Sequence, residues 1–111
     1  MRILLVEDEP RLNEFVSKGL KEQGYSVSAV TNGGEALELA ATEFYDLIIL
    51  DLMLPNMNGY DVLKYMKKND NLADIPVIIL SAKSSELDIV KGLDLGASDY
   101  MTKPFGILEL S

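Results

Sequence analysis

The sequence predicts a single α/β domain built on a parallel sheet. Short apolar runs, which suit strands buried on both faces, alternate along the chain with segments whose apolar residues recur at helical spacing. The length of 111 residues suits one compact domain, and a hydrophobic content of 48% is enough for a core. Ligands of such sheets bind beyond the carboxyl ends of the strands.

The first half of the chain supplies three strands and two helices. Residues 3–6 form an unbroken apolar run, expected to be the first strand. Pro10 suits the first turn of the helix that follows, and Gly24 suits its end. The apolar residues at helical spacing between them are Leu12, Phe15, Val16, Gly19 and Leu20. Residues 25–30 are expected to form the second strand.

Asn32 can cap the second helix, because its side chain can accept a backbone N–H of the first turn. The apolar side of this helix is expected to contain Ala36, Leu37, Leu39 and Ala40. Residues 47–50 are the third strand. After the turn at Pro55, apolar residues at Val62, Leu63 and Met66 mark a third helix.

The second half repeats the alternation of strand and helix. Residues 77–80 are the fourth strand, and a helix follows with apolar residues at Leu87, Val90, Leu93 and Leu95. Ser84, Ser85 and Glu86 suit the start of that helix, and Gly96 suits its end. Residues 99–102 are a short fifth strand, and residues 105–110 are expected to begin a fifth helix.

Composition excludes several classes of function. The chain has no cysteine and no histidine, which removes thiol nucleophiles, Ser-His-Asp triads and imidazole metal ligands. Any bound metal is therefore expected to have oxygen ligands, as Mg²⁺ prefers. The net charge of −8 opposes binding to DNA phosphates or anionic lipid. The apolar run after Arg2 is too short for a signal peptide or a membrane span, so we expect a soluble, cytoplasmic domain.

Polar residues follow four of the five strands. The strand ends deliver Glu7 and Asp8 followed by Glu9, then Asp51, then Ser81 and Ala82, and finally Lys103 and Pro104. Since the carboxyl ends of parallel strands share one edge, the fold is expected to gather three carboxylates, one hydroxyl and one ammonium in a single crevice.

Each of these groups has a use in phosphoryl transfer. Clustered carboxylates repel one another unless a cation neutralises them, and Mg²⁺ is the natural candidate. Lys103 offers a charge for one oxyanion, and Ser81 can donate to a second oxygen. With no histidine or cysteine to compete, Asp51 can act as the nucleophile and form an acyl phosphate. For Asp51 alone, a helix cap would be the more common explanation, and the convergence of the other groups favours a phosphoryl site.

The motifs resemble the response regulator receiver domain of two-component signalling. The matching residues are Glu7-Asp8, Asp51 with Met53-Leu54-Pro55 and Gly59, Ser81-Ala82, and Lys103-Pro104-Phe105. They occur in the family's order and spacing over the whole chain, and the closest likeness is to the branch with a winged-helix DNA-binding domain. The resemblance implies a flavodoxin-like three-layer (βα)5 fold with sheet order 2-1-3-4-5. It also implies that residues 1–111 are one receiver domain without an effector domain.

The resemblance assigns a role to each site residue. Asp51 is the phosphoacceptor, and Mg²⁺, with Mn²⁺ as a substitute, is held by Glu7, Asp8, Asp51 and the backbone carbonyl of Met53. Lys103, Ser81 and Ala82 contact the phosphoryl group, and the Lys103–Pro104 peptide bond is expected to be cis. Ser81 and Tyr100 form the switch pair, while Met53 and Lys83 tune dephosphorylation. Asn58 stands where the branch usually has aspartate, and either residue can cap a helix.

The resemblance also implies the domain's partners and output. A sensor histidine kinase or a histidine phosphotransfer protein donates the phosphoryl group, although small acyl phosphates can substitute. The chain is then a switch rather than an enzyme, and its output face consists of the fourth helix, the fifth strand and the fifth helix. It is expected to control transcription through a DNA-binding domain absent here, with no direct contact to nucleic acid or membrane.

The fifth helix is shorter than the family's, which predicts a truncated domain. We expect Ile3, Leu5 and Phe15 to be exposed by the loss, and a homodimer or a swapped association to compensate.

Three alternatives come from other classes of protein. A haloacid-dehalogenase-like phosphatase would need a second aspartate two residues after Asp51, where Met53 stands. A flavodoxin-like FMN carrier would need a phosphate-binding loop after the first strand, where Glu7, Asp8 and Glu9 would repel phosphate. A pseudo-receiver, or an engineered truncated interaction module, would not be phosphorylated. A pseudo-receiver would be expected to lack Asp51 or Lys103, and both are present.

Overall fold

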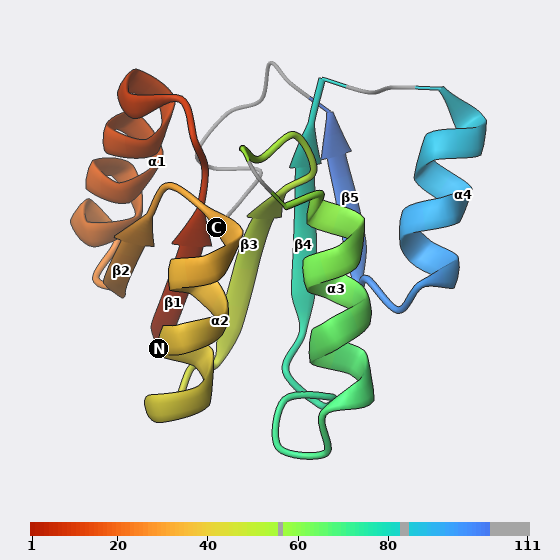
Figure 1. The fold of residues 1–111 in the computed structure, drawn as a ribbon. Coiled ribbons are helices and arrows are strands. Elements are labelled where there is room, and N and C mark those ends of the chain that lie inside the picture. The colour runs from red at the N-terminus through yellow and green to blue at the C-terminus, as the bar shows by residue number, and fades with distance from the viewer. Residues whose placement is uncertain (56, 83–84, 103–111) are drawn as a thin grey trace.

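The computed structural model describes residues 1–55, 57–82 and 85–102, which form a three-layer α/β domain (Figure 1). Five parallel strands lie in the order β2-β1-β3-β4-β5. The strands are Arg2–Val6 (β1), Ser26–Val30 (β2), Leu47–Asp51 (β3), Val77–Ser81 (β4) and Asp99–Thr102 (β5). The helices are Pro10–Glu22 (α1), Gly33–Thr42 (α2), Gly59–Lys68 (α3) and Glu86–Asp94 (α4). The predicted alternation and the sheet order 2-1-3-4-5 are confirmed.

Two apolar cores lie on opposite faces of the sheet. On one face, Ile3 and Leu5 of β1 pack with Val16 and Leu20 of α1. On the other face, the alternate residues of β1 and β3 pack with α2 and α3. The buried members of this second core include Leu4, Val6, Ala36, Ile48, Leu50, Val62, Leu63 and Met66. Because successive strand residues point to opposite faces, the central strands must be apolar on both sides, as their unbroken runs predict.

Most helix boundaries lie where the sequence places them. Asn32 caps α2 by accepting the backbone N–H of Glu35, and Asn58 caps α3 by accepting that of Tyr60. Ser85 caps α4. Gly24 and Gly96 follow α1 and α4 with φ of 96° and 110°, in the left-handed region that favours glycine.

The expected exposure of Ile3 and Leu5 is wrong. Both side chains are buried, at 1% and 0% exposed, because they pack between the sheet and α1. Phe15, on α1, is 57% exposed, as expected. The expected fifth helix at residues 105–110 lies outside the described residues.

Three apolar residues of α4 lie at the surface rather than against the sheet. Leu87, Val90 and Leu93 are 83%, 52% and 42% exposed, although their spacing is that of a buried helix face. Within residues 86–94, only Gly92 is buried. A Cβ at Gly92 would lie 2.8 Å from Ile79 Cδ1 and 3.1 Å from a ring carbon of Tyr100, so α4 meets the sheet at a point without a side chain. Its apolar stripe is therefore turned outward.

No helix among the described residues is both long enough and apolar enough to cross a membrane.

Candidate functional site

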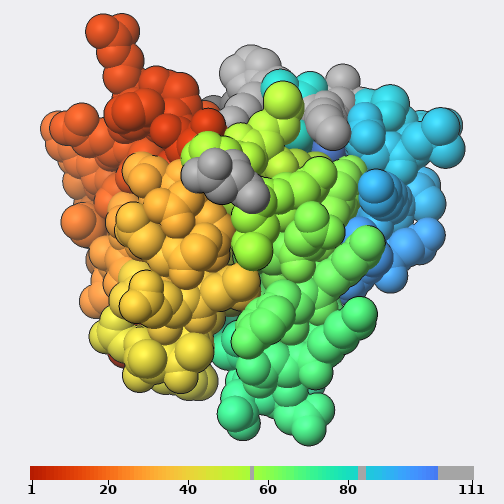
Figure 2. Space-filling view, viewed as in Figure 1, coloured from red at the N-terminus to blue at the C-terminus, as the bar shows by residue number. Residues whose placement is uncertain are grey.

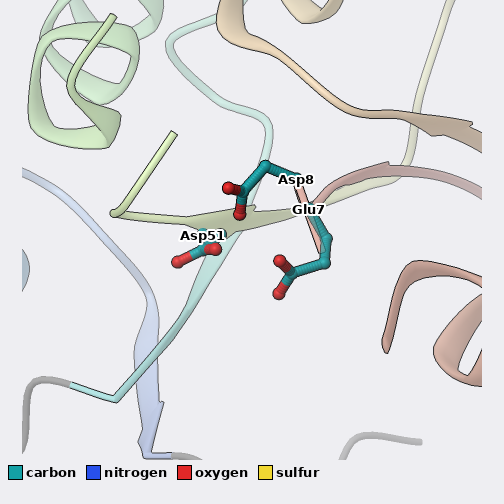
Figure 3. A group of neighbouring side chains, drawn as sticks. All are labelled: Glu7, Asp8 and Asp51. Atoms are coloured by element: carbon teal, nitrogen blue, oxygen red, sulfur yellow. The ribbon is translucent and has the colours of Figure 1, made fainter. Parts of the chain in front are cut away.

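Three carboxylates gather at the edge of the sheet formed by the carboxyl ends of the strands. Glu7 and Asp8 directly follow β1, and Asp51 is the last residue of β3. One oxygen from each residue lies within 4.8 Å of an oxygen of the other two, and Figure 3 shows the three side chains converging on a common space. Glu7 and Asp51 are buried, at 1% and 3% exposed, whereas Asp8 lies nearer the surface. The predicted acidic crevice is present.

The neighbouring strands set this geometry. β1 and β3 are paired in parallel, with Val6 beside Leu50, so the residues that follow them emerge together. Glu7 donates its backbone N–H to the carbonyl of Val30 at 3.1 Å, which extends the pairing with β2 by one residue. The backbone N–H of Glu9 donates to Oε2 of Glu7 at 3.0 Å and so fixes one oxygen of that carboxylate.

Asn13 of α1 stabilises the loop after β1 through two side-chain hydrogen bonds. Its Nδ2 donates to the carbonyl oxygens of Glu7 and Val30, at 2.9 and 3.0 Å. This α1 residue is only 9% exposed, and its amide joins the ends of β1 and β2. Asn13 is not among the site residues predicted from the sequence. The available signal was a polar residue on the same helical face as Val16 and Leu20, where a buried amide needs partners.

Asp51 is held by the loop that follows it. Its Oδ1 accepts the backbone N–H of Met53 at 3.0 Å, and the carbonyl of Leu52 accepts the N–H of Gly59 at 3.0 Å. A Cβ at Gly59 would lie 2.5 Å from the Asp51 carbonyl oxygen, so the start of α3 packs against the end of β3 at a distance that only glycine permits.

Glu9 is not part of the acidic group. Its carboxylate accepts the N–H groups of Arg11 and Leu12, at 3.2 and 2.6 Å, and thereby caps α1. Of the three consecutive acidic residues, Glu9 therefore caps the helix, whereas Glu7 and Asp8 belong to the acidic group.

Ser81 and Tyr100 meet beneath α4. Ser81 ends β4 with a fully buried side chain, and it shares a side-chain hydrogen bond with Tyr100 of the adjacent strand β5. Burial raises the pKa of Tyr100 above its usual value, and the negative charges of Asp88 and Asp51 raise it further, while the Ser81 hydrogen bond opposes the rise. Ser81 does not cap α4, because Ser85 does so.

The remaining predicted residues are only partly described. Met53 has a side chain that is 57% exposed, beside the acidic group, and Ala82 is exposed after β4. A hollow of about 510 Å³ adjoins the acidic group and is lined by Asp8, Leu52, Met53, Leu54, Pro55, Met57 and Asn58. Lys103, Pro104 and Lys83 lie outside the described residues.

The donor set fits a hard divalent cation. It consists of three carboxylate oxygens, with neither imidazole nor thiolate in the sequence, and Mg²⁺ and Ca²⁺ take oxygen ligands of this kind. A sheet of order 2-1-3-4-5 with an acidic group at the carboxyl ends of β1 and β3 defines a doubly wound α/β domain with a candidate site for a divalent metal at the edge where such sheets bind their ligands.

The family signature of the response regulator receiver domain matches residues 3–111. The chain belongs to that family. It is 47% identical over 110 residues to the transcriptional regulatory protein HprR of Escherichia coli K12, and 44% identical to CusR of the same strain. Each alignment covers 99% of this chain and 48% of the relative, so the chain spans about half the length of the curated relatives it matches.

Solved structures support the same assignment. The receiver domain of the Francisella response regulator 1452 superimposes with a TM-score of 0.93 and 38% identity, over 98% of this chain and 88% of that one. Glu7, Asp8 and Asp51 form an acidic cluster that is typical of the Mg²⁺ site of receiver domains.

Proposed function

We propose that the chain is a phosphoryl-accepting switch in which Asp51 is the acceptor and a histidine kinase or a histidine phosphotransfer protein is the donor. The observation that supports this most directly is the grouping of Asp51 with Glu7 and Asp8, where the strand holds the carboxylate rigidly at the rim of an open hollow.

The chemistry follows from the carboxylate. An Asp51 oxygen attacks the phosphorus of a phosphohistidine, the P–N bond breaks, and the imidazole nitrogen leaves with the electron pair and takes up a proton. The product is an aspartyl acyl phosphate. The Met53 N–H, which donates to Oδ1 of Asp51, orients the carboxylate for this attack.

The other residues hold and neutralise the transferred group. Glu7 and Asp8 are proposed to hold Mg²⁺ together with Asp51 and the backbone carbonyl of Met53. When bound, this cation supplies positive charge to the phosphoryl oxygens. Lys103, Ser81 and the backbone of Ala82 are proposed to contact the remaining oxygens, and the Met53 and Lys83 side chains to adjust how readily water reaches the acyl phosphate.

The output is proposed to be a change at α4 and β5. Phosphorylation replaces the single negative charge of the Asp51 carboxylate with a phosphoryl group of roughly −1.5 to −2, so the position gains about one unit of negative charge or less and three new acceptor oxygens. Ser81 would move toward the phosphoryl group, and Tyr100, which shares a hydrogen bond with it, would follow. The outward stripe of Leu87, Val90 and Leu93 is then a surface that a partner or a second copy could read.

The relatives suggest the biological setting. They are named as transcriptional regulators, and this chain aligns with about half of each. We therefore propose a cytoplasmic receiver that controls transcription together with a DNA-binding domain, and that makes no contact of its own with nucleic acid.

Intact-mass spectrometry after incubation with acetyl phosphate and Mg²⁺ tests the proposal. One added phosphoryl group is expected, and it should be absent from Asp51→Asn and from a sample treated with a chelator. Asp46→Asn is the matched control, because Asp46 precedes β3 at the opposite edge of the sheet and should leave the adduct unchanged. A folded, Mg²⁺-binding protein that forms no adduct would favour the pseudo-receiver.

A further inference from the structure

A cluster around Tyr60 joins α3 to α4. Tyr60 is the second residue of α3, only 4% exposed, and its hydroxyl donates to the backbone carbonyl of Asp88 in α4 at 3.3 Å. The ammonium of Lys91, one turn further along α4, lies 4.3 Å from the centre of the Tyr60 ring. One aromatic side chain thus holds α4 through a hydrogen bond at its rim and a cation–π contact on its face. Figure 2 shows α3 and α4 side by side on this surface.

Among the described residues, α4 has few other buried contacts with the rest of the domain. Gly92 is its only buried residue, and the helix lies on Ile79 and Tyr100 there without a side chain of its own. Leu87, Val90 and Leu93 of α4 are exposed, and Ile89 is half-buried. A helix with so little buried apolar surface depends on its remaining contacts for its position.

The same residue is tied to the phosphoacceptor strand. Tyr60 directly follows Gly59, whose N–H donates to the Leu52 carbonyl and whose Cα packs against the Asp51 carbonyl. Tyr60 is therefore linked to the end of β3 through the adjacent Gly59, and it contacts α4 through its own side chain.

We propose that Tyr60 is a positioning residue that couples the Asp51 loop to α4, along a route separate from the Ser81–Tyr100 pair. A shift of the loop after Asp51 moves the start of α3, and the Tyr60 ring transmits that shift to Asp88 and Lys91. These two contacts of the Tyr60 ring, with the Asp88 carbonyl and with the Lys91 ammonium, form a clamp on α4. The clamp also limits local opening of α4 in the unphosphorylated protein. The coupling rests on the proposed function, whereas the clamp itself does not.

The test compares amide hydrogen exchange in Tyr60→Phe with that in Tyr65→Phe. Tyr65 is the matched control, because it lies on the same helix with a 52% exposed side chain. Loss of one neutral hydrogen bond corresponds to about a fivefold change in an equilibrium. Exchange of the amides in residues 86–94 should therefore rise about fivefold in Tyr60→Phe, with β1 and β3 unchanged, and should not rise in Tyr65→Phe.

Lys91 provides an independent check on the clamp. Lys91→Gln should raise α4 exchange by roughly two- to fivefold, and Lys91→Arg should restore protection because it keeps the cation over the ring. Unchanged α4 exchange in both Tyr60→Phe and Lys91→Gln would overturn the clamp. An equal rise over the whole sheet would overturn it too, since that result means general destabilisation.

Phosphorylation then tests the coupling. In the wild type, treatment with acetyl phosphate and Mg²⁺ should change α4 exchange; in Tyr60→Phe the adduct should form but the change should shrink at least twofold. An undiminished response in a phosphorylated Tyr60→Phe protein would overturn the coupling. Absence of an adduct in the wild type would instead overturn the proposed function, and the exchange data on the unphosphorylated protein would still decide on the clamp.

Discussion

Gly59 and Asp51 touch where α3 begins and β3 ends. A Cβ on Gly59 would lie 2.5 Å from the carbonyl oxygen of Asp51, and equally close to the Cα of Leu52. Both neighbours are backbone atoms, which cannot rotate away as a side chain could. The first turn of α3 is therefore seated directly on the strand end that presents the proposed phosphoacceptor.

Gly59→Ala should accordingly destabilise the fold and disturb the site. Forcing a methyl group into this contact is expected to lower the free energy of unfolding by about 1–3 kcal/mol. Urea denaturation measures the loss. Gly34→Ala is the control, because a Cβ at Gly34 would meet only the Asn32 side chain at an ordinary 3.4 Å. Equal stability of the two variants would contradict the prediction, because it would show that the backbone of Asp51 and Leu52 can move away from the added methyl group at no cost.

Neutralising an acid of the crevice should have opposite effects on folding and on metal binding. Asp8→Asn removes one of three mutually repelling carboxylates, so the metal-free protein should melt at a higher temperature. The same change removes an oxygen ligand, so Mg²⁺ affinity should fall by at least about tenfold. Calorimetry measures both quantities, and Glu14→Gln on the surface of α1 should change neither. A lower melting temperature for metal-free Asp8→Asn would argue against repulsion in the crevice.

Asn13→Ala should weaken the loop that presents Glu7 and Asp8. The variant leaves the carbonyl oxygens of Glu7 and Val30 without the amide that now donates to both, which is expected to cost about 1–3 kcal/mol of stability. Thermal or urea unfolding checks this. Asn71→Ala, at an exposed position after α3, should stay within about 0.5 kcal/mol of the wild type. A loss no larger than that of the control would mean that water replaces the amide.

The ionisation of Tyr100 should depend on Asp51. The Asp51 charge is one of the causes that raise the pKa of Tyr100, so Asp51→Asn should bring that pKa down toward its usual value. Ultraviolet titration of the wild type and Asp51→Asn, each beside its Tyr100→Phe derivative, isolates this phenol. Asp74→Asn, in the loop before β4, is the control. An unchanged Tyr100 titration would mean that Asp51 and Tyr100 are electrostatically independent.

The raised pKa values of Tyr60 and Tyr100 predict how the stability of the fold changes at alkaline pH. Burial is the main cause that raises both pKa values, so the folded state binds these phenol protons more tightly than the unfolded state does. The unfolded phenols lose their protons first as pH rises past 10.0, so stability should be level below that pH and should fall above it. Urea midpoints across this range should fall less in a Tyr60→Phe, Tyr100→Phe double variant.

Much of the fold could be predicted because its signals are local. The apolar runs of β1, β3 and β4 and the caps at Asn32 and Asn58 depend on neighbouring residues in the chain. The convergence of Glu7, Asp8 and Asp51 follows from the parallel topology alone, since all three leave strands at the same edge.

The errors and omissions concern packing between distant segments. The sequence does not show that Ile3 and Leu5 are covered, because that depends on which helix crosses this face of the strand. The spacing of Leu87, Val90 and Leu93 indicates a helix, but it does not show which face of the helix packs on the sheet. That orientation is set by the close packing of Gly92 against Tyr100. No local pattern pairs a tyrosine with a carbonyl 28 residues away, so Tyr60 gave no signal.

The most direct test asks whether Asp51 itself carries the phosphoryl group. Borohydride reduction of the acetyl phosphate-treated protein converts an aspartyl phosphate to homoserine, and peptide mass spectrometry then locates the altered residue. We expect homoserine at position 51 alone, and only after treatment with acetyl phosphate in the presence of Mg²⁺. Homoserine at Asp8 or another acid, with Asp51 unmodified, would contradict it.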